Sequence, residues 1–402
     1  MAKIVMCWEL GGDLGHVARM KPLAEALAKR GHRVDFILRE CLPAERLLDP
    51  ERFRWFQAPY QTEAVPDQDA APRSLTQVLH NVGFHATRNL VGRLRAWRAL
   101  YALLQPDLLV FDHSPTAMLA ARGLRIPRLV LGTGFGIPPA RTPLPRFDGG
   151  ADDAGLKTEE DRVTANTNAA LGVLGTPPLS RLADIYDAEA QVFFTFRELD
   201  HYPGRDAGDY WGVTQQDAGV PPLWPEPATP AAPADRRVFA YLKPFETLPS
   251  LLSTLREAGH PTLIYMGKGT KDIAKQFAGG TFAFSERPVD LGAAVAAADV
   301  VICHSGHGTV SAALLGGKPL LLLPLNMEQR MLSARVMQAG AGLAAPALSP
   351  EGMRDKFLRL MAEPAFSSAA KRFAERHASH EVDTIPARFA ALAERLIASE
   401  AP

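Results

Sequence analysis

Residues 3–38 read KIVMCWELGGDLGHVARMKPLAEALAKRGHRVDFIL, and this stretch decides the fold class. A short apolar run ends at a glycine-rich turn. The next residues place apolar side chains at helical spacing as far as Gly31, and a second apolar run follows. A strand, a helix and a strand in this order form a βαβ unit. We therefore predict a parallel sheet that contains these two strands.

The same alternation returns twice along the chain. The strand pattern PDLLVFD ends at Asp112 and is followed by a helical and a third strand pattern, and strands and helices alternate again after residue 237. A proline-rich stretch separates the two parts and is typical of a semi-rigid linker. The prediction is an α/β protein with two doubly wound domains facing a central cleft, where ligands bind at the carboxyl ends of strands. We place the domains at 1–220 and 237–375, the linker at 221–236, and at 376–402 a C-terminal helix that packs back on the first domain.

Composition excludes several classes of protein. The 402 residues include 44 Lys plus Arg and 44 Asp plus Glu, so the net charge is zero and no nucleic-acid partner is expected. The cysteines, Cys7, Cys41 and Cys303, are far apart, which gives no disulfide framework and fits a reducing compartment. No apolar run approaches the roughly 18 residues of a membrane-spanning helix. We expect a cytoplasmic monomer or homodimer without a transmembrane segment.

The second domain contains the motif CHSGHGTVSAALLGGKPLLLLPLNMEQR at residues 303–330. His304 ends a predicted strand, Gly306 and Gly308 allow a tight turn, and Thr309 is the predicted N-cap of the next helix. Free N–H groups and the positive end of the helix dipole at such a helix start favour an anion. A histidine beside them can donate a hydrogen bond to a phosphate oxygen. The motif therefore predicts a diphosphate site.

Two other interpretations of this motif stay open. His304 and His307 are three residues apart and have the chemistry of metal ligands, but no nearby Cys, Asp or Glu completes a set. The loop could also be structural, with both histidines packed and hydrogen-bonded. We expect no metal and no cofactor.

The order HSGHGT, a helix, GGKPLLLLPL and NMEQ resembles the donor signature of GT-B glycosyltransferases of the UDP-glucuronosyl/glucosyltransferase superfamily, in particular bacterial macrolide and antibiotic glycosyltransferases. The resemblance implies a nucleotide-sugar co-substrate. It also implies a diphosphate site at His304, Ser305, Gly306, Gly308 and Thr309, and a sugar site at Glu328 and Gln329.

Two positions in this half leave alternatives open. Lys243 lies where the family has a small Gly-Ser loop, and it would either contact a donor phosphate or be a solvated lysine. Many family members have a glutamate for the ribose hydroxyls where this chain has Ala312, so UDP and dTDP both remain possible.

The opening GGDLGHVARMKPLAEALAKRGHRV resembles the start of the same superfamily. The resemblance implies that His16 is the general base and that Asp112 orients it, which suits an imidazole that titrates near neutral pH. The alternative for Asp112 is a helix N-cap, with Ser114 as competitor, and Asp13 is an alternative acid. His32 follows a helix C-cap glycine and is expected to be structural.

The implied reaction is an inverting, metal-independent transfer to a hydroxyl, nitrogen or sulfur of a small acceptor. Aromatic and apolar content predicts a hydrophobic or aromatic acceptor, with a lipid as second choice, bound by Phe84, His85, Arg88 and Phe135. Two further hypotheses are a nucleotide-sugar epimerase or hydrolase of the same fold, and a non-catalytic nucleotide-sugar binding protein.

Overall fold

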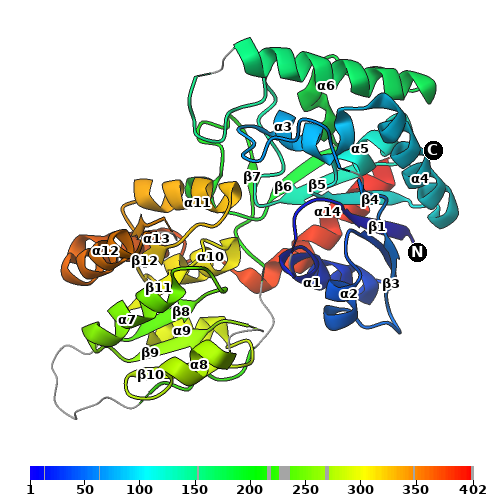
Figure 1. Ribbon diagram of the computed structural model, residues 1–402. Coiled ribbons are helices and arrows are strands. Elements are labelled where there is room, and N and C mark those ends of the chain that lie inside the picture. Colours follow the sequence, from blue (N-terminus) through cyan, green and yellow to red (C-terminus); the bar gives the residue numbers. More distant parts are fainter. Residues whose placement is uncertain are drawn as a thin grey trace. The chain divides into compact units, whose positions relative to one another are not determined.

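The computed structural model describes most of the chain (Figure 1). The described residues are 1–12, 14–62, 64–151, 154–214, 219–225, 236–267, 271–346 and 349–399. Asp13 and most of the predicted linker 221–236 lie outside them.

The chain divides into two compact units, and it passes between them more than once. The first unit comprises Met1–Phe196, Tyr202–Gln215 and Glu381–Pro402, and the second comprises Arg197–His201 and Gln216–His380. The sequence analysis placed the division at the proline-rich stretch, a few residues later. The short segment Arg197–His201 has no compositional mark that assigns it to the second unit.

The first unit is built on a parallel sheet. Its described strands follow the order β3-β2-β1-β4-β5-β6-β7. They are β1 (Lys3–Trp8), β2 (Arg33–Leu38), β3 (Arg54–Gln57), β4 (Leu108–Asp112), β5 (Arg128–Gly132), β6 (Ala190–Phe193) and β7 (Asp209–Tyr210). The predicted βαβ unit is present, with α1 (Gly15–Lys29) between β1 and β2.

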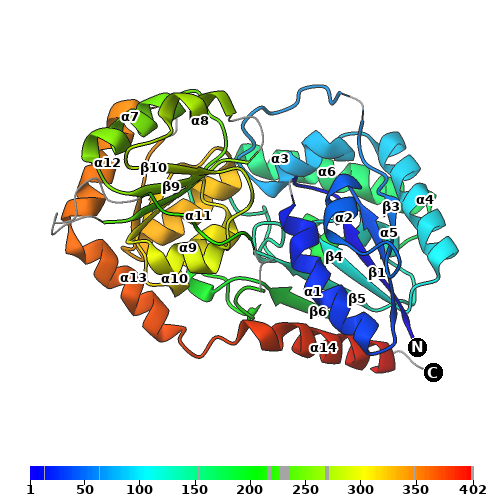
Figure 2. The same ribbon diagram turned by 90° about the horizontal axis from the view of Figure 1, so that it is seen from below.

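Helices cover both faces of this sheet (Figures 1 and 2). One face carries α1, α2 (Leu42–Leu47) and α14 (Ile385–Ser399). The other carries α3 (Leu75–Leu79), a kinked turn at His80–Phe84, α4 (Thr87–Leu104), α5 (Pro115–Ala121) and α6 (Ala154–Val173). Short 3-10 turns lie at Leu182–Tyr186 and Val382–Thr384.

The apolar core of the first unit explains why the C-terminal helix returns to it. Ile4, Met6 and Trp8 of β1 belong to the same buried cluster as Leu23 of α1 and Phe389 of α14. Within the range 376–402 predicted as a C-terminal helix, α13 of the second unit ends at Arg376, and α14 packs beside α1 in the first unit.

The second unit repeats the architecture with its own sheet and core. The described strand order is β10-β9-β8-β11-β12-β13, again parallel. The strands are β8 (Val238–Tyr241), β9 (Thr262–Tyr265), β10 (Phe282–Ser285), β11 (Val300–Cys303), β12 (Leu320–Leu322) and β13 (Gly342–Ala344). The helices are α7 (Leu248–Ala258), α8 (Lys271–Phe277), α9 (Leu291–Ala297), α10 (His307–Leu315), α11 (Met327–Gln338), α12 (Pro350–Ala362) and α13 (Pro364–Arg376), and Arg197–Leu199 form a 3-10 turn.

Each sheet has a position where the strand order reverses. In the first sheet this switch point lies between β1 and β4, where Trp8 pairs with Asp112. In the second it lies between β8 and β11, where Tyr241 pairs with Cys303. Doubly wound proteins bind ligands beyond the strand carboxyl ends at such points. His16 and His304, the two histidines given roles from the sequence, follow these strands.

No helix in the described part of the chain is long and apolar enough to cross a membrane.

Candidate active site

The switch point of the first sheet brings His16 and Asp112 together. His16 is the second residue of α1, and Asp112 is the last residue of β4. His16 Nδ1 lies 3.0 Å from Asp112 Oδ2, and the Trp8 indole stacks on the imidazole with ring centroids 4.9 Å apart. Because an ionised carboxylate only accepts hydrogen bonds, Nδ1 carries the proton. In the neutral ring, Nε2 is then the basic nitrogen.

Arg19 also binds Asp112, and the sequence analysis missed it. Its Nη1 donates to the same Oδ2 over 2.8 Å. Burial alone would raise the pKa of the Asp112 carboxyl, but the charges of Arg19 and His16 outweigh burial and hold its pKa below the ordinary 3.8. Asp112 is therefore ionised at neutral pH. The signal available in the sequence was the spacing, because Arg19 lies three residues after His16 and so on the same side of α1.

The helix-cap alternative for Asp112 is not what the structure shows. The N-cap of α5 is Ser114, whose own side chain makes no capping bond, and Glu9 Oε2 accepts from the backbone N of Thr116 in the first turn. Ser114 Oγ instead donates to the backbone oxygen of Asp112. His32, expected to be structural, accepts a hydrogen bond from the backbone N of Ala2 and lies 3.1 Å from Glu394 of α14.

Gly11 leaves His16 Nε2 open. Its φ of +89° lies in the left-handed region, which favours glycine. A Cβ at this position would lie 2.6 Å from His16 Nε2. Any side chain at residue 11 would therefore strain the turn and crowd the basic nitrogen.

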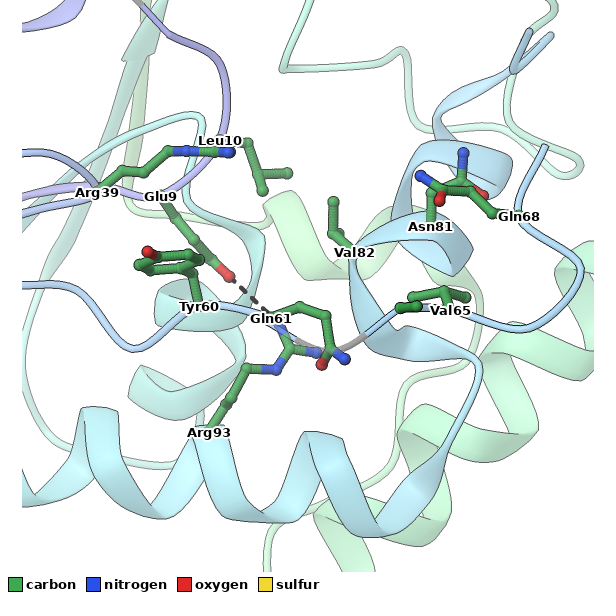
Figure 3. A pocket seen from close by; sticks show the side chains of 11 residues that line it. Glu9, Leu10, Arg39, Tyr60, Gln61, Val65, Gln68, Asn81, Val82 and Arg93 are labelled. Carbon is green, nitrogen blue, oxygen red and sulfur yellow. Dashed lines mark ion pairs between the residues drawn. The ribbon is translucent and has the colours of Figure 1, made fainter. Parts of the chain in front are cut away.

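A cavity of about 250 Å³ lies at the same edge of the first sheet (Figure 3). Its walls come from the residues after β1 and β2, the loop after β3, the kinked turn and α4. Glu9 and Leu10 line it, and they directly precede Gly11. The cavity and the His16–Asp112 pair are therefore supplied by neighbouring strand ends.

None of the four predicted acceptor residues lines this cavity. Phe84 is completely buried, and Arg88 is exposed on α4. His85 is half-buried, and Phe135 is half-buried edge-on to the ring of His113. The residue of α4 that lines the cavity is Arg93. It lies five positions after Arg88, and at 100° per residue this places it about 140° around the helix.

The second switch point carries the predicted diphosphate motif, with one correction. Helix α10 begins at His307 with Gly306 as its N-cap, so Thr309 is the third helical residue and not the cap. The backbone of Gly306 is extended, as is usual for an N-cap residue, and the helix therefore begins earlier than predicted. No side chain caps α10. The N–H groups of its first turn, which includes Gly308, thus have the geometry of an anion site.

The His304 ring lies between two backbone carbonyl groups. Nδ1 is 2.7 Å from the oxygen of Leu323, and Nε2 is 3.2 Å from the oxygen of Lys243. Burial lowers the pKa of His304, so the ring is neutral at neutral pH and carries one proton. The shorter contact places this proton on Nδ1. For Nε2 to donate to a phosphate, as predicted, the ring must gain a second proton.

The hydroxyl of Ser305 is used inside the protein. Ser305 Oγ and Ser333 Oγ are 2.7 Å apart, and Ser333 Oγ donates to the oxygen of Gln329 over 2.7 Å. Ser305 is therefore the donor of the first bond, and this chain of hydrogen bonds ties the turn before α10 to α11. Ser305 is buried and has a φ of +59°.

The predicted sugar residues begin helix α11. Asn326 caps it by accepting from Gln329 N, and the Gln329 side-chain oxygen accepts from Leu325 N over 2.7 Å. Glu328 lies in the first turn, half-buried. Within the described residues its carboxylate has no hydrogen bond or ion pair. The carboxylate is therefore available to accept hydrogen bonds from a ligand.

Groups of three or more His, Cys, Asp or Glu side chains that would hold a metal ion are absent from the part of the chain that the structure describes. His304 and His307 therefore do not form part of such a cluster there. Lys243, just after β8, is exposed.

The chain is similar to known proteins in sequence and in fold. Residues 260–383 match the family model of the glycosyltransferase family 28 C-terminal domain. A PGL/p-HBAD biosynthesis glycosyltransferase of Mycobacterium tuberculosis is 25% identical, over 90% of this chain and 86% of its own. The zeaxanthin glucosyltransferase of Pantoea ananas is 24% identical, over 81% of both chains.

Solved structures share the whole fold. The calicheamicin glycosyltransferase CalG4 superposes with a TM-score of 0.72 at 20% identity, over 100% of this chain and 99% of that one. The spinosyn rhamnosyltransferase SpnG with spinosyn aglycone gives a TM-score of 0.65 at 18% identity, over 96% and 99%. SpnG has also been solved with thymidine diphosphate.

Fold and relatives together define the class: the chain is a glycosyltransferase with the GT-B fold. The resemblance drawn from the sequence is confirmed at this level.

Proposed function

We propose that the chain transfers a sugar from a UDP- or dTDP-sugar to a hydroxyl group of a small natural-product acceptor, with inversion and without a metal ion. The hydrogen-bonded pair of His16 and Asp112 at the first switch point carries the proposal. Relatives named for their action on zeaxanthin, spinosyn and calicheamicin support the acceptor class. The thymidine diphosphate bound by SpnG supports a nucleoside-diphosphate donor.

The reaction is a single displacement at the anomeric carbon. His16 Nε2 takes the proton of the acceptor hydroxyl while its oxygen forms a bond to the anomeric carbon. The bond between this carbon and the diphosphate oxygen breaks, and the nucleoside diphosphate leaves. Asp112, held ionised by Arg19, keeps the Nδ1 proton in place and stabilises the imidazolium that forms.

The second unit is proposed to hold the donor. The uncapped start of α10 offers N–H groups and a positive dipole end to the diphosphate, and the Glu328 carboxylate accepts from sugar hydroxyls. The helix end would meet the charge of the leaving group, so we propose that no metal or other cofactor is needed.

The test is a transfer assay with UDP- and dTDP-sugars and a panel of hydroxylated natural products, run with and without EDTA. His16→Ala is expected to lower kcat by about 10²–10⁴, and Asp112→Asn by a comparable amount, with donor affinity unchanged by calorimetry. Full transfer by His16→Ala would refute the base. Loss of activity in EDTA that a divalent ion restores would refute metal independence.

A further inference from the structure

The cavity at the first switch point contains a buried ion pair whose hydrogen bonds are incomplete. Figure 3 shows the side chains of Glu9 and Arg93 pointing toward each other at the cavity wall. Glu9 Oε1 and Arg93 Nη1 are 3.5 Å apart, and the residues are 0% and 8% exposed.

Each partner has some of its hydrogen bonds and lacks others. Glu9 Oε2 accepts from the backbone N of Thr116, and Arg93 Nη1 donates to Thr116 Oγ1. Glu9 Oε1 and Arg93 Nε and Nη2 are buried and have no hydrogen-bond partner. Buried polar networks in native proteins are normally satisfied, because an unpaired buried group carries its full desolvation cost. The vacant donors and acceptor therefore point to a ligand group.

The local backbone keeps this position open. Gly83, in the kinked turn, has a φ of +95°. A Cβ there would lie 2.6 Å from the Gln61 side-chain oxygen and 2.8 Å from Arg93 Nη2. A side chain at residue 83 would thus take the space beside the guanidinium.

The charges decide which ligand group fits. The pair offers N–H donors from Arg93 and a carboxylate acceptor from Glu9 at the same place. A carboxylate on the ligand would bind Arg93 but be repelled by Glu9, and an ammonium group would bind Glu9 but be repelled by Arg93. A neutral group that both donates and accepts, such as a hydroxyl, satisfies both partners.

We propose that Glu9 and Arg93 select acceptors whose ring carries a second hydroxyl group, uncharged and distinct from the hydroxyl that receives the sugar. The proposal rests on the proposed function, since it describes the acceptor of the same reaction. The cavity volume of about 250 Å³ is somewhat smaller than the roughly 300 Å³ at which drug-sized ligand pockets begin. It has room for one substituted ring. Amide side chains of Gln61, Gln68 and Asn81 on the other walls add to the polar lining. An acceptor that presents only hydrocarbon at this position would leave Glu9 Oε1 and Arg93 Nε and Nη2 without a hydrogen-bond partner.

The experiment compares the binding of four small phenols that differ in one meta substituent. The probes are resorcinol, its mono-methyl ether, meta-hydroxybenzoate and meta-hydroxybenzylamine, titrated by calorimetry into the full-length protein. The hydroxyl probe is expected to bind at least about tenfold more tightly than the other three, because each of them loses one bond or meets a like charge. Glu9→Gln removes the negative charge with little change of shape. In this variant meta-hydroxybenzoate should no longer bind more weakly than resorcinol.

A second variant protects the test against misfolding. Ala64 lines the cavity from an exposed position, so Ala64→Trp should narrow the cavity and weaken resorcinol binding about tenfold or more, with Ala64→Ser as the matched control. Equal affinity for all four probes, or tightest binding of the carboxylate, would overturn the proposal. The binding of the probes is measured without sugar transfer. Inactivity toward every sugar donor would therefore refute the proposed function, but it would not change the measured preference for the hydroxyl probe.

Discussion

At the scale of single residues, the Asp112 carboxylate is shared between the guanidinium of Arg19 and the imidazole of His16. Arg19 Nη1 and His16 Nδ1 both bind Oδ2, at 2.8 and 3.0 Å. Arg19 therefore has a positioning role, because it keeps the carboxylate ionised and oriented for the proposed base.

Removing Arg19 should change the pH dependence of transfer. Arg19 lowers the pKa of Asp112 and burial raises it, so in Arg19→Gln the pKa of Asp112 rises. Activity is then lost at a higher pH on the acid side, whereas in the wild type the pKa of Asp112 is held below its ordinary value. The measurement is kcat/KM between pH 4 and 9. An acid limb that does not move, with kcat reduced equally at every pH, would show that Arg19 acts only on stability.

His304 should take up a proton when the donor binds. Its pKa is lowered by burial in the free protein, and its Nε2 has to be protonated to donate to a phosphate. A nearby diphosphate favours the imidazolium, so the pKa rises on binding and donor affinity should fall as the pH rises through neutrality.

Calorimetry with UDP-glucose or a dTDP-sugar, in buffers of different ionisation enthalpy, measures this proton uptake. Each phosphate of a nucleotide sugar carries one ester and one anhydride bond and has a single, strongly acidic ionisable oxygen, so the ligand itself does not titrate near neutrality. His304→Asn serves as the control and should bind more weakly with no linked proton. Zero proton uptake by the wild type would contradict the phosphate role of Nε2.

At the scale of elements, the two strand-to-helix turns were predictable, and the approach of α4 to the first of them was not. The βαβ pattern and the strand PDLLVFD predicted that His16 and Asp112 lie at carboxyl ends of strands, and the family resemblance implied that the two residues form a pair. Arg93 is 84 positions from Glu9, and its approach depends on the rotation of α4, which periodicity alone does not determine. The prediction of Thr309 as the N-cap of α10 was wrong, because the helix already begins at His307, with Gly306 in extended backbone as its N-cap.

The hydrogen-bond chain from Ser305 to α11 joins the two elements of the proposed donor site. Ser305 and Ser333 are both buried, and Ser333 is the middle member. Ser333→Ala leaves the Ser305 hydroxyl without its acceptor, which should cost about 1–3 kcal/mol of unfolding free energy. Donor affinity should fall as well, since the turn before α10 loses its tie. Denaturant unfolding measures the first effect and calorimetry the second.

The matched control for that experiment is Ser399→Ala. Ser399 Oγ donates to the oxygen of Leu396 near an exposed helix end, so its loss should change the unfolding free energy by less than about 0.5 kcal/mol. Equal effects of the two substitutions would show that the buried chain contributes nothing special to the second unit.

At the scale of the whole molecule, the chain builds two cores and ends in the one where it began. Phe389 of α14 is completely buried in the core of the first unit, although the preceding helix, α13, belongs to the second. Phe357 of α12 is likewise completely buried, in the core of the second unit. The final helix therefore makes the stability of the proposed base-bearing unit depend on the last residues of the chain.

Phe389→Ala should lower the unfolding free energy of the first unit by about 3–5 kcal/mol, the usual cost of truncating a buried phenylalanine. Phe357→Ala should do the same to the second unit. Differential scanning calorimetry with and without a nucleotide sugar separates the two, because a donor bound to the second unit raises only the transition of that unit. We expect Phe389→Ala to leave donor affinity unchanged and Phe357→Ala to weaken it. If Phe389→Ala lowered the ligand-stabilised transition instead, α14 would have to support the donor site, and the assignment of the C-terminal helix to the first unit alone would fail.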